Sequence, residues 1–202
     1  MSKPDRNDTR NNKSVLLLEA MASCTAVTEV HGRLVGDPLD VQMFEATGWI
    51  LDESQQEANG VIARVHPKEV LGSAAKTGEQ SLINNLTNEP KYINNLIRRF
   101  DFSSELQRMS VICRNDIDGG EFKAFVKGSP EKISELCRPE TIPSNFKVVL
   151  SKYTTEGYRV IALSCKDLAG MDLQRAHSIT REEVESNLTF LGLLVMENKM
   201  KP

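Results

Sequence analysis

The spacing of apolar residues near the start of the chain predicts a helix. Leu17, Met21 and Cys24 follow one another at intervals of four and three residues, so they would line one helix face. Ser14 precedes them and has a side chain suited to cap a helix N-terminus. We therefore expect an amphipathic helix from Ser14, after a flexible lead-in formed by the polar residues 1–13.

A second helix is predicted directly after Asp37. Asp37 can cap this helix, and Pro38 fits its first turn, where a missing N–H costs no hydrogen bond. The helix would run to about Thr47, with Gly48 supplying the left-handed stop.

Residues 52–90 are polar, with few large apolar side chains. We expect a long surface insertion there, partly disordered.

The second half of the chain has the alternation typical of strands. Residues 109–114 and 121–127 are strand-like and flank the Asp-Gly-Gly of residues 118–120, which is a hairpin signal. In the second strand, alternation would place Phe122, Ala124 and Val126 on one face and Lys123, Phe125 and Lys127 on the other.

Two more helices and two more strands are expected after this hairpin. They are a helix opening at Ser129-Pro130 with Ile133, Leu136 and Cys137 inward, a helix over residues 144–156 closed by Gly157, and strands over 158–165 and 188–196. This order of elements predicts an α+β fold with a mainly antiparallel sheet flanked by helices.

Composition narrows the class of protein. Hydrophobic residues make up 40% of the 202 residues and charged residues 26%, which is ordinary for a globular domain with a core. The formal net charge of −3 provides no basic surface for nucleic acid or for anionic lipid. Because apolar runs are too short to cross a bilayer, we expect a protein that is not itself inserted in a membrane. We also expect it to be a monomer.

The four cysteines indicate a reducing compartment. Cys24, Cys113, Cys137 and Cys165 each lie in an apolar segment, and none belongs to a Cys-x-x-Cys pair. Four Asn-x-Ser/Thr sequons point the other way. However, they are short patterns in an Asn-rich chain and no signal peptide precedes them. We therefore expect reduced, buried thiols in a cytosolic protein.

Several catalytic and metal motifs can be set aside. The segment 75–78 (Ala-Lys-Thr-Gly) has Ala75 where a phosphate-binding loop needs glycine and where an aspartyl-phosphate site needs aspartate. His31, His66 and His177 are scattered, without the spacing of metal ligands. We expect no catalytic residue and no metal site in this chain.

The segment from Phe102 to Met109 has two interpretations. An exposed Phe102 beside Gln107 and Met109 could stack on a flat ring and hydrogen-bond its edge. A core phenylalanine followed by a polar turn is the alternative, and spacing alone favours it.

Two positively charged residues also leave alternatives open. Lys127 is followed by Gly128 and a helix N-terminus, which suits an anion or nucleotide, but an ordinary strand-to-helix turn with a solvated lysine fits equally well. Arg159, at the start of an apolar strand, could pair with a phosphate or with a structural carboxylate.

Taken together, these segments indicate one protein family far more specifically than any single segment does. The chain closely resembles the nucleotide-binding domain of P-type transport ATPases, and within them the fifth class and its polyamine-transporter branch. The segments that carry the resemblance are 21–24 (MASC), 34–40 (LVGDPLD), 43–49 (MFEATGW), 102–104 (FSS), 107–109 (QRM), 127–131 (KGSPE), 136–143 (LCRPETIP), 157–163 (GYRVIAL) and 196–202 (MENKMKP).

The resemblance implies an ATP site of seven residues. It places Phe102 on the adenine ring, Asp40 near the adenine amino group, Gln107 and Met109 along the pocket, Lys127 at its bottom with Gly128 allowing close approach, and Arg159 at the phosphates. Gln107 stands where calcium-pump relatives carry lysine.

The resemblance also implies the rest of a pump. Residues 14–195 would be the nucleotide-binding domain and 196–202 the start of the return into a phosphorylation domain. The phosphorylated Asp of the family is absent, so we expect the fragment to bind ATP weakly without hydrolysing it. In the full-length enzyme it would present ATP, with Mg²⁺, to that Asp, and its partners would be the phosphorylation and actuator domains of the same chain.

The implied location is the cytosolic face of a membrane, in a late endosomal or lysosomal compartment. The alternative is an interaction or regulatory domain that keeps the fold without binding nucleotide. The presence of Phe102, Lys127 and Arg159 argues against that alternative.

Overall fold

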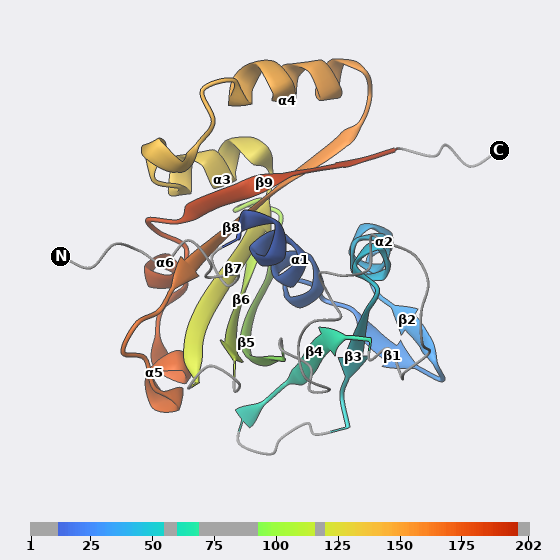
Figure 1. Ribbon diagram of the computed structural model, residues 1–202, viewed down its shortest axis with the longest axis vertical. Coiled ribbons are helices and arrows are strands. Elements are labelled where there is room, and N and C mark those ends of the chain that lie inside the picture. The colour runs from blue at the N-terminus through green and yellow to red at the C-terminus, as the bar shows by residue number, and fades with distance from the viewer. Residues whose placement is uncertain (1–11, 55–59, 69–92, 116–119, 198–202) are drawn as a thin grey trace, which may run out of the picture.

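A seven-stranded antiparallel sheet, in the order β3-β4-β5-β6-β7-β8-β9, forms the centre of the computed structural model (Figure 1). The structure describes residues 12–54, 60–68, 93–115 and 120–197. Its elements are α1 Lys13–Ser23, β1 Thr28–Val30, β2 Arg33–Val35, α2 Pro38–Thr47, β3 Trp49–Asp52, β4 Ala63–Pro67, β5 Asn94–Ser103, β6 Arg108–Asn115, β7 Glu121–Gly128, α3 Pro130–Leu136, a 3-10 turn Pro139–Thr141, α4 Phe146–Thr155, β8 Arg159–Asp167, α5 Leu173–Ser178, α6 Arg181–Val184 and β9 Thr189–Met196. The predicted α+β class with a mainly antiparallel sheet is confirmed.

Helices cover both faces of the sheet. Helices α1 and α2 pack on one face, where buried side chains such as Met43, Phe44 and Phe125 form the largest apolar cluster. On the other face, α3 and α4 cover a cluster around Ile133 and Phe190, whereas α5 and α6 cover a separate cluster. We call the α1/α2 side the front face and the α3–α6 side the back face.

Local signals account for the two N-terminal helices, with one correction. Helix α2 begins at Pro38 with the Asp37 side chain accepting from Leu39 N–H, and Gly48 ends it at φ 67°. Helix α1 also forms as predicted, but Asn12 caps it, with its side chain accepting from the N–H of Ser14. The expectation that Ser14 is the cap is therefore wrong. Asn and Ser have similar capping preferences, so sequence alone does not separate them.

Part of the segment expected to be a polar insertion belongs to the sheet. Strand β4 pairs with both β3 and β5, and Val61, Ala63 and Val65 are buried. The expectation of a surface insertion is wrong for this stretch, because alternating small apolar residues form a strand. The remainder of the predicted insertion, 55–59 and 69–92, lies outside the described residues.

The β6–β7 hairpin has the faces that alternation predicts. Phe122, Ala124 and Val126 join the back-face clusters, whereas Phe125 joins the front-face cluster. The register pairs Met109 with Lys127 and Arg108 with Gly128. The turn of residues 116–119 lies outside the described residues. Because cross-strand partners share a face, this register fixes which site residues are neighbours.

The pairing of Arg108 with Gly128 depends on the absence of a side chain at residue 128. A Cβ on Gly128 would lie 2.4 Å from the Gln107 carbonyl oxygen and 2.7 Å from Arg108 Cβ. Both distances are below any real contact of a Cβ atom. Gly128 therefore lets the strand ends close on each other, which is a structural reason for glycine separate from access for a ligand.

We predict that Gly128→Ala lowers the free energy of unfolding by about 2 kcal/mol or more, because β6 and β7 must separate to admit the methyl group. Gly192→Ala in β9 is the matched control, since its Cβ would meet only the two methyl groups of Leu17, at an ordinary 3.5 and 3.8 Å. Urea unfolding of both variants measures the difference. Equal stability of the two variants would contradict the close approach.

Candidate functional site

Lys127 and Asp40, two of the seven predicted site residues, form a buried ion pair. The ammonium of Lys127 donates a hydrogen bond to Asp40 Oδ1, and the two residues are only 5% and 7% exposed. The interpretation of Lys127 as a solvated lysine in an ordinary turn is therefore wrong. An isolated charge in this position would be very costly, so each residue requires the other.

The position of Asp40 is set by the N-terminus of α2 and by the chain after α1. Asp40 lies in the first turn of α2, where the helix dipole favours a negative charge. Its second oxygen, Oδ2, accepts from the Ala26 N–H at 3.0 Å. Both carboxylate oxygens are therefore occupied, and the carboxylate joins α2, the α1–β1 connection and strand β7.

Phe102 lies in an exposed bulge of β5, two strands away from Lys127. In β5, Phe100 pairs with Ser110 and Ser103 pairs with Arg108, so Asp101 and Phe102 together stand opposite Met109. Ser103 shares the face of its partner Arg108, opposite to Met109, so alternation places the adjacent Phe102 on the front face with Met109. Met109 pairs with Lys127 in the next ladder, so Phe102 and Lys127 lie on the same face with strand β6 between them.

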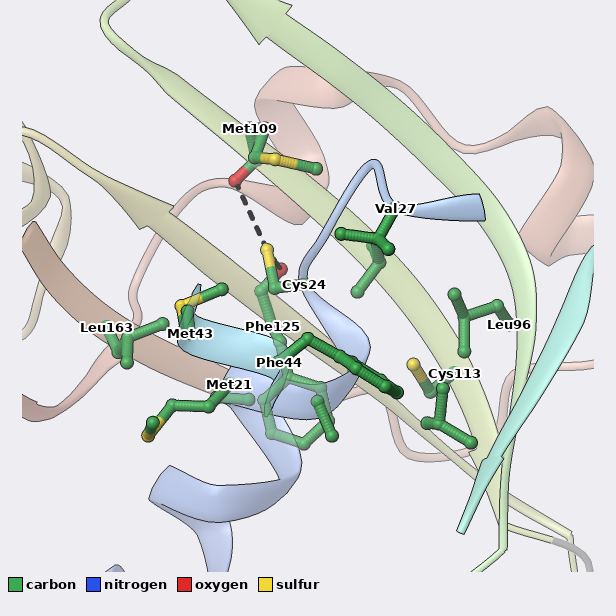
Figure 2. Close-up of a cluster of buried hydrophobic side chains, with 14 of the residues drawn as sticks. Met21, Cys24, Val27, Met43, Phe44, Leu96, Met109, Cys113, Phe125 and Leu163 are labelled. Atoms are coloured by element: carbon green, nitrogen blue, oxygen red, sulfur yellow. Dashed lines mark hydrogen bonds between the residues drawn. The ribbon is translucent and has the colours of Figure 1, made fainter. Parts of the chain in front are cut away.

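Exposure distinguishes Phe102 from its neighbours. The Phe102 side chain is 59% exposed, which is unusual for a large aromatic residue and contradicts the interpretation as a core phenylalanine. Met109 is 1% exposed and packs within the front-face cluster, as Figure 2 shows. Met109 is therefore part of the core beneath the front face, whereas the ring of Phe102 is exposed to solvent.

Gln107 lies at the tip of the β5–β6 hairpin. It has a positive φ of 52°, and its N–H donates to the Ser103 carbonyl at 2.7 Å. Its own carbonyl accepts from Ser129 N–H at 3.0 Å, and Ser129 Oγ donates to Gln107 Oε1 at 3.3 Å. Gln107 is thus tied to the residue that follows Gly128, which brings these predicted site residues together.

Arg159 is separated from the other predicted residues. It is exposed at the start of β8, and alternation places it on the same face as Ile161 and Leu163. Leu163 pairs with Lys127, so Arg159 lies four residues further along the strand, or roughly 13 Å. The structure therefore places a cation on the same face, at a distance from Phe102.

Three residues that the sequence analysis missed lie behind the hairpin. Glu185 is 1% exposed and accepts hydrogen bonds from Arg108 and Arg181 at 2.5 and 2.9 Å. A detectable signal was the capping box of Thr180 and Glu183, which marks the start of α6 and so places Arg181 and Glu185 one turn apart.

Cys24 lies beneath the site and keeps its proton. Its Sγ is 3.8 Å from the Met109 carbonyl oxygen and 3.5 Å from that of Phe125 (Figure 2). Burial raises the pKa of Cys24 from 9.0 to about 12, and nearby Lys127 offsets this only in part. Cys24 is therefore a packing residue with weak hydrogen bonds and not a nucleophile.

Comparison with known proteins identifies the family. Residues 70–202 match the family model described as "P-type ATPase, cytoplasmic domain N". The chain belongs to the P-type ATPase family. The matched part of domain N contains six of the seven predicted site residues, while Asp40 precedes it.

Three relatives of this chain are named as transporting ATPases. The polyamine-transporting ATPase 13A3 of Mus musculus is 40% identical over 189 residues, covering 90% of this chain and 15% of the relative. The probable cation-transporting ATPase 13A4 of Gallus gallus is 43% identical, with 90% and 14% covered. The polyamine-transporting ATPase 13A2 of Homo sapiens is 41% identical, with 92% and 15% covered. The chain thus spans about one seventh of the length of these relatives.

Across the part of domain N that the structure describes, no helix has the length and apolar character to cross a membrane.

We predict that Lys127→Met lowers the free energy of unfolding by about 3–5 kcal/mol, because it leaves the Asp40 carboxylate buried without its cation. The double variant Lys127→Met/Asp40→Asn should recover most of that loss. Urea unfolding of both, in a double-mutant cycle with Asp40→Asn, measures the coupling.

The matched control for this cycle is the exposed pair Lys132–Glu135, at 3.2 Å. Lys132→Met should cost no more than about 0.5 kcal/mol, since exposed pairs are screened by water. A double Lys127/Asp40 variant no more stable than Lys127→Met would show that the ion pair is not the source of the loss.

We predict that stability falls as pH rises above 9 and that Cys24 contributes to this fall. In the unfolded chain the Cys24 thiol ionises near 9.0, whereas in the folded chain it holds its proton until about 12. The unfolded state therefore loses the proton first, and stability decreases by about 1.4 kcal/mol per pH unit within this window. In Cys24→Ala this component is absent. Urea unfolding at pH 8, 9 and 10 should give a shallower pH dependence for the variant, and parallel profiles would refute the prediction.

Proposed function

We propose that this domain N binds ATP on its front face and presents it for phosphorylation of an Asp in another domain of the same pump. The observation that carries the proposal is the exposed ring of Phe102 on the same face as the buried Lys127–Asp40 pair, two strands away from Lys127. An exposed aromatic ring on an otherwise well-packed hairpin is a stacking surface for a flat ligand.

The polar groups around Phe102 suit a nucleobase better than a phosphate. The charge of Lys127 is compensated by Asp40, so this end of the site has little net charge to offer an anion. The side-chain amide of exposed Gln107 can both donate and accept at the edge of a base. We therefore assign Phe102, Gln107, Met109, Lys127, Gly128 and Asp40 to the adenine end of the site.

Arg159 suits the other end of the ligand. It is exposed, lies on the same face, and its guanidinium can bind phosphate oxygens in a bidentate manner. Its separation of roughly 13 Å from the level of Lys127 is of the scale of an extended nucleotide. With a single arginine in this role, we expect weak binding of ATP by the fragment, and no turnover, because the phosphorylated Asp belongs to another domain.

The proposal for the full-length protein rests on the relatives. We infer an ATP-hydrolysing translocase that moves a polyamine or another cation, as the names of the relatives state for those proteins. Mg²⁺ would accompany ATP, and the partners of domain N would be the phosphorylation and actuator domains of the same chain. Domain N would close on them by a hinge motion at the cytosolic face of a late endosomal or lysosomal membrane.

We predict that ATP causes saturable NMR shifts at Phe102, Lys127 and Arg159 and that Phe102→Ala weakens binding roughly tenfold, because stacking on a base contributes about 1–3 kcal/mol. Val148→Ala in α4 is the matched control, since Val148 is a 73% exposed apolar residue on the back-face helix α4. An absence of shifts at millimolar ATP would favour the alternative of an interaction domain that keeps the fold without its nucleotide.

A further inference from the structure

A buried carboxylate lies directly behind the site, on the back face of the hairpin. Glu185 follows helix α6, and its side chain is fully buried. Oε1 accepts from Ser110 Oγ at 2.7 Å and from Arg181 Nε at 2.9 Å, and Oε2 accepts from Arg108 Nε at 2.5 Å. Both oxygens are satisfied, and two of the three donors are arginines.

Arg181 extends this network to the main chain of the bulge. Its Nη1 donates to the Asp101 carbonyl at 3.2 Å, and its Nη2 donates to the Arg108 carbonyl at 2.7 Å. The Asp101 carbonyl belongs to the peptide group that leads into Phe102. A single guanidinium therefore holds both strands of the hairpin at the bulge, and Glu185 holds the guanidinium.

Arg108 braces the turn from the same side. Its Nη1 donates to the Leu106 carbonyl at 3.3 Å, while its Nε bonds Glu185. The Arg108 side chain is directed to Glu185 on the back face, opposite to Met109 and Phe102. Arg108 therefore does not supply a cation to the ligand, and its charge serves the network.

The bulge must be held in one conformation if its aromatic side chain is to stack on a base. Two residues of β5 share one partner in β6, so regular ladder hydrogen bonds do not fix the Asp101–Phe102 peptide. Exposed side chains on an unbraced bulge would sample several orientations, and ordering them on binding weakens affinity. The arginine contacts replace the missing ladder bonds.

We propose that Glu185 is a positioning residue for nucleotide binding, which acts through Arg181 and Arg108 to hold the Asp101–Phe102 bulge in its binding orientation. This inference rests on the proposed function. The alternative is that the Glu185 network only stabilises the fold. A positioning role predicts that disrupting the network weakens binding of the base more than an equally destabilising substitution elsewhere does.

The test compares binding of ATP and of adenosine to the 202-residue chain by NMR titration. Arg181→Lys keeps a cation near Glu185, but one ammonium cannot serve the carboxylate and both carbonyls. Glu185→Gln keeps the shape and removes the charge. The stability control is Phe190→Leu, which disturbs the ring contact with Phe146 at a centroid distance of 5.4 Å in strand β9, three strands away from β6.

The control for the site is Arg159→Ala, which should weaken binding of ATP but leave the affinity for adenosine unchanged. We expect Arg181→Lys and Glu185→Gln to weaken binding of ATP and of adenosine by the same factor, at least about threefold. The NMR signals of Phe102 in the free protein should also change. Phe190→Leu should bind normally in spite of a lower unfolding midpoint.

Each other outcome has a distinct meaning. Wild-type affinity in folded Arg181→Lys and Glu185→Gln, or equal weakening in Phe190→Leu, would overturn the positioning role and leave the proposed function standing. Failure of Arg181→Lys to fold would also overturn it, because the network would then support the whole domain. An absence of ATP shifts in the wild-type chain would instead remove the proposed function itself.

Discussion

The buried ion pair between Lys127 and Asp40 holds the front of this domain together. The two residues are 87 positions apart in the chain, and neither charge could be buried alone. By pairing, they fix the first turn of α2 against the end of β7, and the Ala26 N–H adds the connection after α1 to the same carboxylate. This attachment holds α1 and α2 against the front face, where their side chains cover the sheet.

A second group of charges, around Glu185, contacts strands β5 and β6 from the back. The front-face pair thus holds β7 and the back-face network holds β6, and Gly128 lets the ends of these two strands close on each other. Phe102 remains exposed on the bulge that the Glu185 network contacts. Under the proposed function, this bracing would reduce the ordering that binding of a base requires.

Membership of the P-type ATPase family gives this architecture its context. The proposed function requires domain N to hold a nucleotide firmly enough to carry it to another domain and loosely enough to release it. Under the proposed function, the exposed ring of Phe102 and the exposed Arg159 would be the two ends of the nucleotide site.

The sequence by itself determined the elements whose causes are local. The cap and stop of α2, the two faces of β7, and the resemblance carried by the segments around Phe102 and Lys127 all depend on neighbours along the chain. Tertiary structure decided whether Phe102 is core or exposed and whether Lys127 is solvated or paired. It also decided that residues 63–67 join the sheet and that Glu185 lies behind the bulge. The physical reason is that burial, ion pairing and strand pairing depend on groups brought from distant parts of the chain. Periodicity records only which side of an element a residue occupies.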